Sequence, residues 1–188
     1  LEKGYVGGGN TGRNTTIIRS NYFYPESAAL YDLSVRLYEG LARALNYNIM
    51  FSQRGMMDLV HDEHAVEIAR RAVNAMQING VDAQFLAPEE VRNRAPILNF
   101  SPRARYPILG ATFQGRAGTG RHDAVVWAYA RAADHLGVDI IQNCEVTGFR
   151  NEAGKCTGVE TSRGEIGARH IVAAAAGPSS VLAKMAGY

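Results

Sequence analysis

The sequence is poor in cysteine, which argues against a disulfide-stabilised scaffold. Its two cysteines, Cys144 and Cys156, belong to no CxxC motif and to no metal-spaced cluster. We therefore expect free thiols in a reducing compartment. Long apolar runs are also absent, and the first residues do not resemble a signal peptide. For these reasons we expect a cytoplasmic protein that does not enter a membrane.

The sequence also lacks an excess of charge of either sign. Twenty Lys and Arg residues face eighteen Asp and Glu residues, which leaves a formal net charge of +2. No run of basic residues could follow a phosphate backbone, so nucleic acid is not an expected partner, whereas small anions remain possible ligands. Because 46% of the 188 residues are apolar, the chain can build one or two hydrophobic cores.

What the sequence does contain is an alternation of helix and strand patterns, which is typical of an α/β fold. Helical spacing of apolar residues predicts a first helix with a leucine stripe, a second that ends at Gly80, a short one that begins at Pro88, and another from about His122 to Leu136. A further helix is expected after Ser179. The stripe consists of Leu30, Leu33, Leu37, Leu41 and Leu45. Strands are predicted at residues 50–51, 56–60, 106–114, 138–142, 145–150, 156–161 and 169–175, the first two paired around a turn.

The chain opens with an acidic residue, Glu2, followed at once by a glycine-rich stretch. This is how the second strand of a dinucleotide-binding βαβ unit ends, where a carboxylate accepts hydrogen bonds from ribose hydroxyls about 20 residues after a GxGxxG turn. We therefore expect that the first βαβ unit is missing from these 188 residues, and that a C-terminal portion is missing too, because the helix after Ser179 stops abruptly at Tyr188. This piece alone is expected to hold a dinucleotide cofactor poorly and to be inactive.

The stretch at residues 7–16 concentrates glycine, asparagine and threonine. Glycine lets backbone N–H groups approach a phosphate without an intervening Cβ, and the short polar side chains add donors. The composition by itself fits a surface loop equally well. The position of the stretch, between Glu2 and the apolar Ile17-Ile18 step that carries Arg19, favours the phosphate-binding interpretation.

Several motifs give the chain a specific resemblance. Residues 8–22 (GGNTGRNTTIIRSNY), 51–55 (FSQRG), 79–83 (NGVDA), 110–114 (GATFQ) and 137–148 (GVDIIQNCEVTG) are similar, in order, to the beta subunits of heterotetrameric sarcosine oxidase. The resemblance implies a FAD-binding dinucleotide fold of the D-amino-acid-oxidase type. We expect residues 1–48 and 115–188 to form part of the FAD-binding domain, with residues 49–114 as an inserted α+β domain on the substrate side.

The same resemblance implies a set of residues that bind non-covalent FAD. Glu2 would bind the adenosine ribose, and Val146 would offer its backbone to the adenine. The residues expected on the pyrophosphate and flavin side are Gly9, Asn10, Arg13, Asn14, Thr15 and Thr16, with Lys3 beside Glu2.

Arg19 is the candidate anchor for the substrate. A guanidinium fork pairs both oxygens of a carboxylate in fixed geometry. In an N-methyl amino acid, fixing the carboxylate in this way orients the methyl group. In the simpler monomeric sarcosine oxidases, an arginine in a similar Ile-Ile-Arg-x-x-Tyr context has this role. A surface position or a contact with the flavin phosphate remains the alternative for Arg19.

His122 stands where a loop enters a helix, and its spacing alone indicates a loop or capping residue. The resemblance implies more, because the beta subunits of this family carry FMN bound covalently through a histidine in a similar basic-His-Asp segment. Arg121 stands where the family often has lysine. The positive charge is retained, but a proton-transfer role is not, since arginine stays protonated.

The activity that the resemblance implies is sarcosine oxidation with two flavins. FAD would take a hydride from the N-methyl group, and electrons would pass to FMN and then to O2, giving hydrogen peroxide. The imine would be hydrolysed or passed to tetrahydrofolate, and alpha, gamma and delta subunits would be the partners. The alternatives are a FAD-dependent dimethylglycine- or proline-type dehydrogenase without FMN, and a non-catalytic scaffold subunit.

Overall fold

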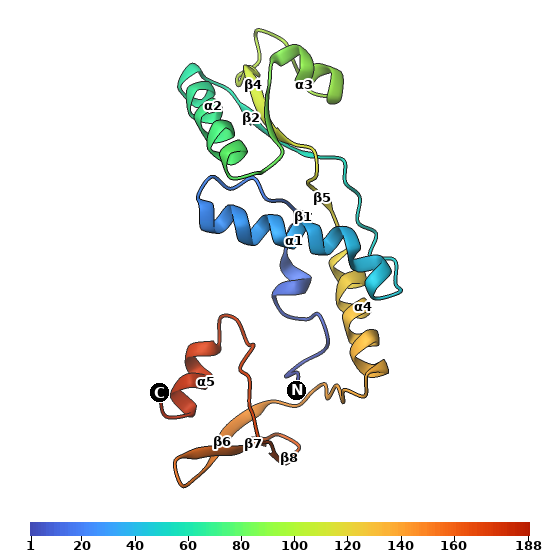
Figure 1. Ribbon diagram of the computed structural model, residues 1–188, viewed down its shortest axis with the longest axis vertical. Helices are drawn as coiled ribbons and strands as arrows, with labels where there is room; N and C mark the ends of the chain where they lie inside the picture. Colours follow the sequence, from blue (N-terminus) through green and yellow to red (C-terminus); the bar gives the residue numbers. More distant parts are fainter. The chain divides into compact units, whose positions relative to one another are not determined.

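The computed structural model describes residues 1–188, which form two compact units (Figure 1). One comprises Leu1–Arg13 with Tyr129–Tyr188, and the other comprises Asn14–Ala128. These boundaries separate compact units of the chain. The division into an FAD-binding domain and an inserted domain at residues 49–114 stays a prediction. None of the helices has the length and hydropathy of a transmembrane span.

The Asn14–Ala128 unit is built around a three-stranded antiparallel sheet with the order β2-β4-β3. The strands are β2 (Met56–Val60), β3 (Ala83–Leu86) and β4 (Gly110–Gln114). Every residue of β4 is buried because it is the central strand. Its side chains alternate between two faces, as those of any strand do. Ala111 and Phe113 therefore face one core, and Thr112 and Gln114 face the other side.

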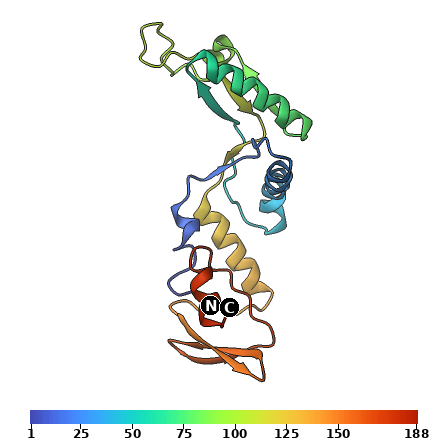
Figure 2. The same ribbon diagram turned by 90° about the vertical axis from the view of Figure 1, so that its left-hand side faces the viewer.

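Helices cover both faces of this sheet (Figure 2). On one side, Val91 of α3 (Pro88–Arg94) packs with Leu86, Ala111 and Phe113. On the other side lies α2 (Glu63–Ile78), whose buried residues join a cluster with the start of α1 (Pro25–Ala44) and with β3. The members of this second cluster are Ala28, Val73, Met76, Val81 and Ala83.

The predicted helices are present, and their ends follow the local signals. The side chain of Asp62 accepts a hydrogen bond from the backbone N–H of Ala65 and caps α2, which ends before Gly80 at a φ of 80°. Proline begins α3, as expected. Helix α4 (His122–His135) is followed by Gly137 at a φ of 81°, a conformation that glycine adopts without steric cost.

The leucine stripe predicted for α1 is buried only at its C-terminal end. Leu41 packs with Ile49 and Val125, whereas Leu30, Leu33 and Leu37 are 61%, 55% and 61% exposed. The helix buries another face, because Ala28 enters the cluster with α2 and Asp32 is drawn to the guanidinium of Arg116.

The predicted pairing of residues 50–51 with residues 56–60 is wrong. Met50 has a φ of 53°, which cannot continue a strand, and β2 pairs with β4 instead. Nearby, β1 (Ile17–Ile18) pairs with β5 (Gly118–Thr119), and Ser52 bridges to Thr119. The segment before Arg19 is therefore joined to the segment before His122.

In the Leu1–Arg13 and Tyr129–Tyr188 unit, three strands form an antiparallel sheet in sequence order. They are β6 (Val146–Glu152), β7 (Lys155–Thr161) and β8 (Gly164–Gly167), and the last was not predicted. The short helices of this unit are η1 (Asn10–Arg13) and α5 (Ser179–Met185).

Two strands predicted in this unit are not formed. Residues 169–175 are mostly exposed and pair with no strand, and a strand needs a neighbour to bond with. Residues 138–142 do run beside the N-terminus, because the N–H of Glu2 donates to the carbonyl of Ile141 at 2.9 Å. Asn143, at a φ of 51°, interrupts a regular ladder there.

Candidate functional site

Glu2, Lys3 and the start of β6 are brought together at one edge of the first unit. The carbonyl of Glu2 accepts a hydrogen bond from the N–H of Cys144 at 2.9 Å, and Lys3 forms a 2.7 Å ion pair with Glu145. Val146, the expected adenine contact, is the next residue along the chain. Glu2 and Lys3 therefore lie on a segment that neighbours the one carrying Val146, although more than a hundred positions separate the two segments in sequence.

The carboxylate of Glu2 also shapes the turn that follows it. Its Oε1 accepts a hydrogen bond from the N–H of Gly4 at 2.8 Å, while Oε2 accepts none within the chain. An unengaged carboxylate oxygen at a strand end is a suitable acceptor for a ribose hydroxyl. The structure places no other group of the chain on that oxygen.

The glycine-rich loop is compact, and one of its glycines is required by packing. A Cβ on Gly12 would lie 2.6 Å from the carbonyl oxygen of Gly7, whereas Gly9 has open space around it. The N–H of Val6 donates to Oε1 of Gln142 at 2.8 Å, which anchors the loop at its start. Gln142 was not singled out from the sequence. Arg13 ends η1 with an exposed guanidinium that forms no ion pair.

Asn14, Thr15 and Thr16 belong to the second unit and lead into β1. Oδ1 of Asn14 accepts a hydrogen bond from the N–H of Thr16 at 2.7 Å, which stabilises a turn in which Thr16 has a φ of 61°. The carbonyl of Thr16 accepts from the N–H of Gly120 at 3.1 Å. Thr16 is thereby bonded to Gly120, which stands two positions before His122 in the sequence.

Arg19 is held by polar and aromatic neighbours, and no carboxylate of the chain pairs with it. Its Nη1 donates to Oδ1 of Asn21 at 2.6 Å, and its guanidinium carbon lies 4.9 Å from the centre of the Tyr22 ring. Tyr22 in turn stacks on Tyr31 at 4.1 Å. Partial burial, together with the hydrogen bond to Tyr31, raises the pKa of Tyr22 above 10.0. The positive charge of Arg19 is therefore oriented but not neutralised.

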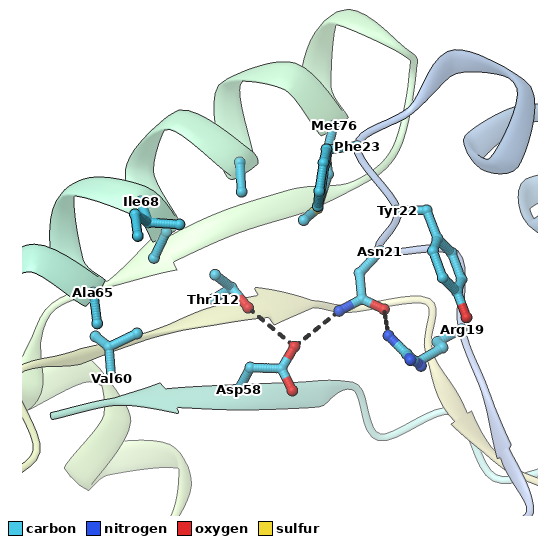
Figure 3. Close-up of a pocket in the computed structure, with 12 residues that line it drawn as sticks. Arg19, Asn21, Tyr22, Phe23, Asp58, Val60, Ala65, Ile68, Met76 and Thr112 are labelled. Carbon is cyan, nitrogen blue, oxygen red and sulfur yellow. Dashed lines mark hydrogen bonds between the residues drawn. The ribbon is translucent and has the colours of Figure 1, made fainter.

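Arg19 lies at the polar end of a cavity of about 440 Å³ between α2 and the sheet (Figure 3). Asp58 accepts hydrogen bonds from Nδ2 of Asn21 at 2.9 Å and from Oγ1 of Thr112 at 3.4 Å, so these side chains form a chain that leads to Arg19. The remaining wall is apolar and is formed by Phe23, Val60, Ala65, Ile68, Ala69, Ala72 and Met76. The polar end therefore carries one cation, Arg19, and one carboxylate, Asp58, beside an apolar wall. Such a lining suits a small amino acid that has charged groups of both signs and an apolar group.

Asn21, Asp58 and Thr112 were not found from the sequence. The available signals were weak: Asn21 stands two positions after Arg19, and Asp58 is the charged residue within a predicted apolar strand. Their convergence depends on the pairing of β2 with β4, in which Asp58 lies opposite Thr112.

His122 is the first residue of α4, and its ring nitrogen Nδ1 is buried without a hydrogen-bond partner. An unsatisfied buried nitrogen is rare in folded proteins and needs an explanation. The preceding Arg121 is engaged by Asp123, with contacts of 2.9 Å to Oδ1 and 2.6 Å to Oδ2. The segment thus presents an unpaired imidazole nitrogen beside a helix N-terminus, where anionic groups are favoured. These features fit the attachment of a flavin.

The Arg121–Asp123 pair makes a testable pH prediction. The hydrogen bonds from Arg121 lower the pKa of Asp123 from 3.8 to about 2. Because this pKa is lowered in the folded state, the contribution of the pair to stability is present above pH 3.8 and is lost as the pH falls through about 2. An NMR titration of the Asp123 carboxyl carbon should show the low midpoint, and Arg121→Gln should return it towards 3.8. An unchanged midpoint in that variant would contradict the assigned cause.

Comparison with known proteins gives a consistent picture. The family model described as FAD dependent oxidoreductase matches residues 1–188. The chain is 53% identical over 188 residues to sarcosine oxidase subunit beta of Arthrobacter sp, and 55% identical over 187 residues to that of Rhizobium meliloti. Both matches extend over 100% of this chain, but over only 46% and 45% of the two relatives. The chain therefore spans less than half the length of the curated relatives that it matches.

A solved structure of L-proline dehydrogenase from P. horikoshii superposes on the whole chain with a TM-score of 0.90 at 26% identity, and the chain covers 48% of it. Glycine oxidase from Bacillus cereus superposes on 89% of the chain with a TM-score of 0.77 at 24% identity, and 45% of that structure is covered. The second likeness shows the fold alone.

Proposed function

The chain belongs to the family of FAD-dependent oxidoreductases, and we propose that it is part of a flavoenzyme that oxidises sarcosine or a related N-methyl amino acid. The observation that carries this proposal is the unneutralised guanidinium of Arg19 at the polar end of a cavity. It is supported by identities of 52–55% to proteins named sarcosine oxidase subunit beta. The experiment that tests it is an assay of the full-length complex for sarcosine-dependent uptake of O2 and release of peroxide.

FAD would be held through the residues at the two ends of the glycine-rich loop. Glu2 would accept hydrogen bonds from the ribose, Val146 would offer backbone groups to the adenine, and Lys3 would help to fix these two segments relative to each other. The pyrophosphate and flavin side would be bound by Gly9, Asn10, Arg13, Asn14, Thr15 and Thr16. When bound, FAD supplies the acceptor for a hydride, and this chemistry belongs to the cofactor.

Loss of the Glu2 charge should weaken the binding of FAD. In the full-length enzyme, Glu2→Gln should raise the Kd for FAD about tenfold, since a hydrogen bond to a charged group contributes about 1.5–3 kcal/mol. Fluorescence titration of the apoenzyme with FAD measures this. Glu165→Gln is the matched control, because it makes the same change in β8, where Glu165 pairs with Arg150 at the surface. Equal Kd values for both variants would contradict the role of Glu2.

The substrate would be oriented by Arg19. Its guanidinium would pair with the carboxylate of the substrate, while Asn21 and Tyr22 limit the positions that the guanidinium can take. The apolar wall, formed mainly by α2, would pack against the N-methyl end of the substrate. Binding and orientation are therefore the contributions of this chain's residues to the rate.

A second flavin, FMN, would be attached covalently to His122, with O2 as the final acceptor and peroxide as the product. The buried, unpartnered Nδ1 supports this site. Alpha, gamma and delta subunits, and tetrahydrofolate as an acceptor of the one-carbon unit, belong to the same proposal.

The second candidate is a dehydrogenase without FMN. It is favoured by the superposition on L-proline dehydrogenase over the whole chain. Such an enzyme would keep the residues around Glu2 and Arg19 but would carry no flavin on His122. A scaffold subunit without catalytic activity would show no sarcosine-dependent turnover in the full-length complex.

A further inference from the structure

Ser20, the residue after Arg19, is fully buried and is bonded on two sides by a single side chain. Its backbone N–H donates to Oε1 of Gln114 at 2.8 Å, and Nε2 of Gln114 donates to its Oγ at 2.6 Å. Gln114 ends β4 and is only 1% exposed. The segment that carries Arg19 is therefore attached to the central strand of the sheet through an amide 94 positions away in the sequence.

A third bond fixes the orientation of this amide. Nε2 of Gln114 also donates to Oδ1 of Asp82 at 3.0 Å, and Oδ2 of Asp82 accepts from the N–H of Arg116 at 2.7 Å. The two amide hydrogens of Gln114 are thereby both used, which a flipped amide could not reproduce. The carboxylate of Asp82 thus determines which end of the Gln114 amide faces Ser20.

We propose that Gln114, oriented by Asp82, is a positioning residue for Arg19. This inference rests on the proposed role of Arg19 in binding a substrate carboxylate. The guanidinium itself is held by Asn21 and Tyr22, both of which follow Ser20 closely. Asn21 and Tyr22 follow Ser20 along the chain, so the position of the backbone at Ser20 affects where both side chains begin. A displacement of about 1 Å at an orienting group can lower the rate by about a hundredfold. The bonds between Ser20 and Gln114 therefore help to determine how accurately the guanidinium of Arg19 is placed.

The test uses two substitutions and their combination in the full-length complex. Gln114→Glu places a second carboxylate against Asp82, and like charges in contact disfavour each other. In Asp82→Asn, one carboxylate oxygen is replaced by an NH2 group, so the side chain can no longer accept hydrogen bonds on two oxygens from Gln114 and from the N–H of Arg116. The double variant Gln114→Glu/Asp82→Asn exchanges donor and acceptor, so that every hydrogen bond to Ser20 and to the N–H of Arg116 can form again.

The KM for sarcosine should rise about tenfold in Gln114→Glu, with a smaller fall in kcat, and should return to within about twofold of the wild type in the double variant. Glu90→Ala is the control, because it removes the hydrogen bond that the Glu90 carboxylate accepts from the N–H of Ala87 at the start of α3, on the opposite face of the sheet. That control should lower the Tm without changing the KM.

Ser20→Ala is a milder variant that removes only the bond to Oγ, and it should raise the KM about threefold. An unchanged KM in Gln114→Glu would overturn the inference, as would a double variant that gives no recovery. If Gln114→Glu does not fold, an unchanged KM in Ser20→Ala overturns it. If Arg19→Ala also leaves the KM unchanged, the proposed function of Arg19 fails, and the two failures are thus distinguished.

Discussion

Replacing Arg19 by alanine is expected to raise the KM for sarcosine of the full-length enzyme about a hundredfold. Two charge-assisted hydrogen bonds to one carboxylate contribute about 3 kcal/mol, which corresponds to a factor of about 150 in affinity. Arg19→Lys should recover only part of this loss, because an ammonium group cannot present the planar fork of a guanidinium. Steady-state kinetics with sarcosine as the varied substrate measure both effects.

The matched control for this substitution is Arg92→Ala. The guanidinium carbon of Arg92 lies 4.9 Å from the ring centre of Phe100, the same distance as that of Arg19 from Tyr22. Arg92 is in α3, which packs on the other face of the sheet. Its loss removes a similar cation–π contact without touching the cavity, so the KM should stay unchanged. A similar rise in both variants would assign the effect of Arg19 to stability.

The charge of the substrate provides an independent check. The neutral amide of sarcosine lacks the carboxylate, so the wild type should use it poorly, whereas Arg19→Ala should discriminate little between acid and amide. A variant that retains the full preference for the acid would show that another cation binds the carboxylate.

The parts of the fold that the sequence predicted are those determined by neighbouring residues. The start of α3 at Pro88, the end of α2 before Gly80 and the end of α4 before Gly137 each depend on one local signal. The FAD-binding fold of the D-amino-acid-oxidase type is confirmed by the family match and by the superposition on L-proline dehydrogenase. This part of the prediction came from the resemblance rather than from periodicity.

What the sequence could not give depends on contacts between distant segments. The exposed side of α1 was mispredicted because leucine spacing does not show that Arg116 draws Asp32 to the buried side. Residues 169–175 have the composition of a buried strand, yet no segment of the chain pairs with them. The surroundings of Arg19 follow the same rule, because Asp58 bonds to Asn21 and Gln114 bonds to Ser20, and both come from strands that are distant in sequence and paired in the sheet.

The second large effect is expected at His122. When the full-length protein is denatured and separated by electrophoresis, flavin fluorescence should remain on the wild-type chain and should be absent from His122→Ala. The supporting observation is that Nδ1 of His122 is buried and has no hydrogen-bond partner in the chain, which is rare in folded proteins.

The control for His122 lies at the other end of the same helix. His135 is the last residue of α4, so His135→Ala should keep the covalent flavin. Arg121→Lys should also keep it, because the positive charge beside the helix N-terminus is retained and can still pair with Asp123. If the wild-type chain itself carries no fluorescence after denaturation, the FMN proposal fails and the dehydrogenase with FAD alone is favoured. If fluorescence persists in His122→Ala, a flavin is attached elsewhere, and the buried nitrogen then needs another explanation.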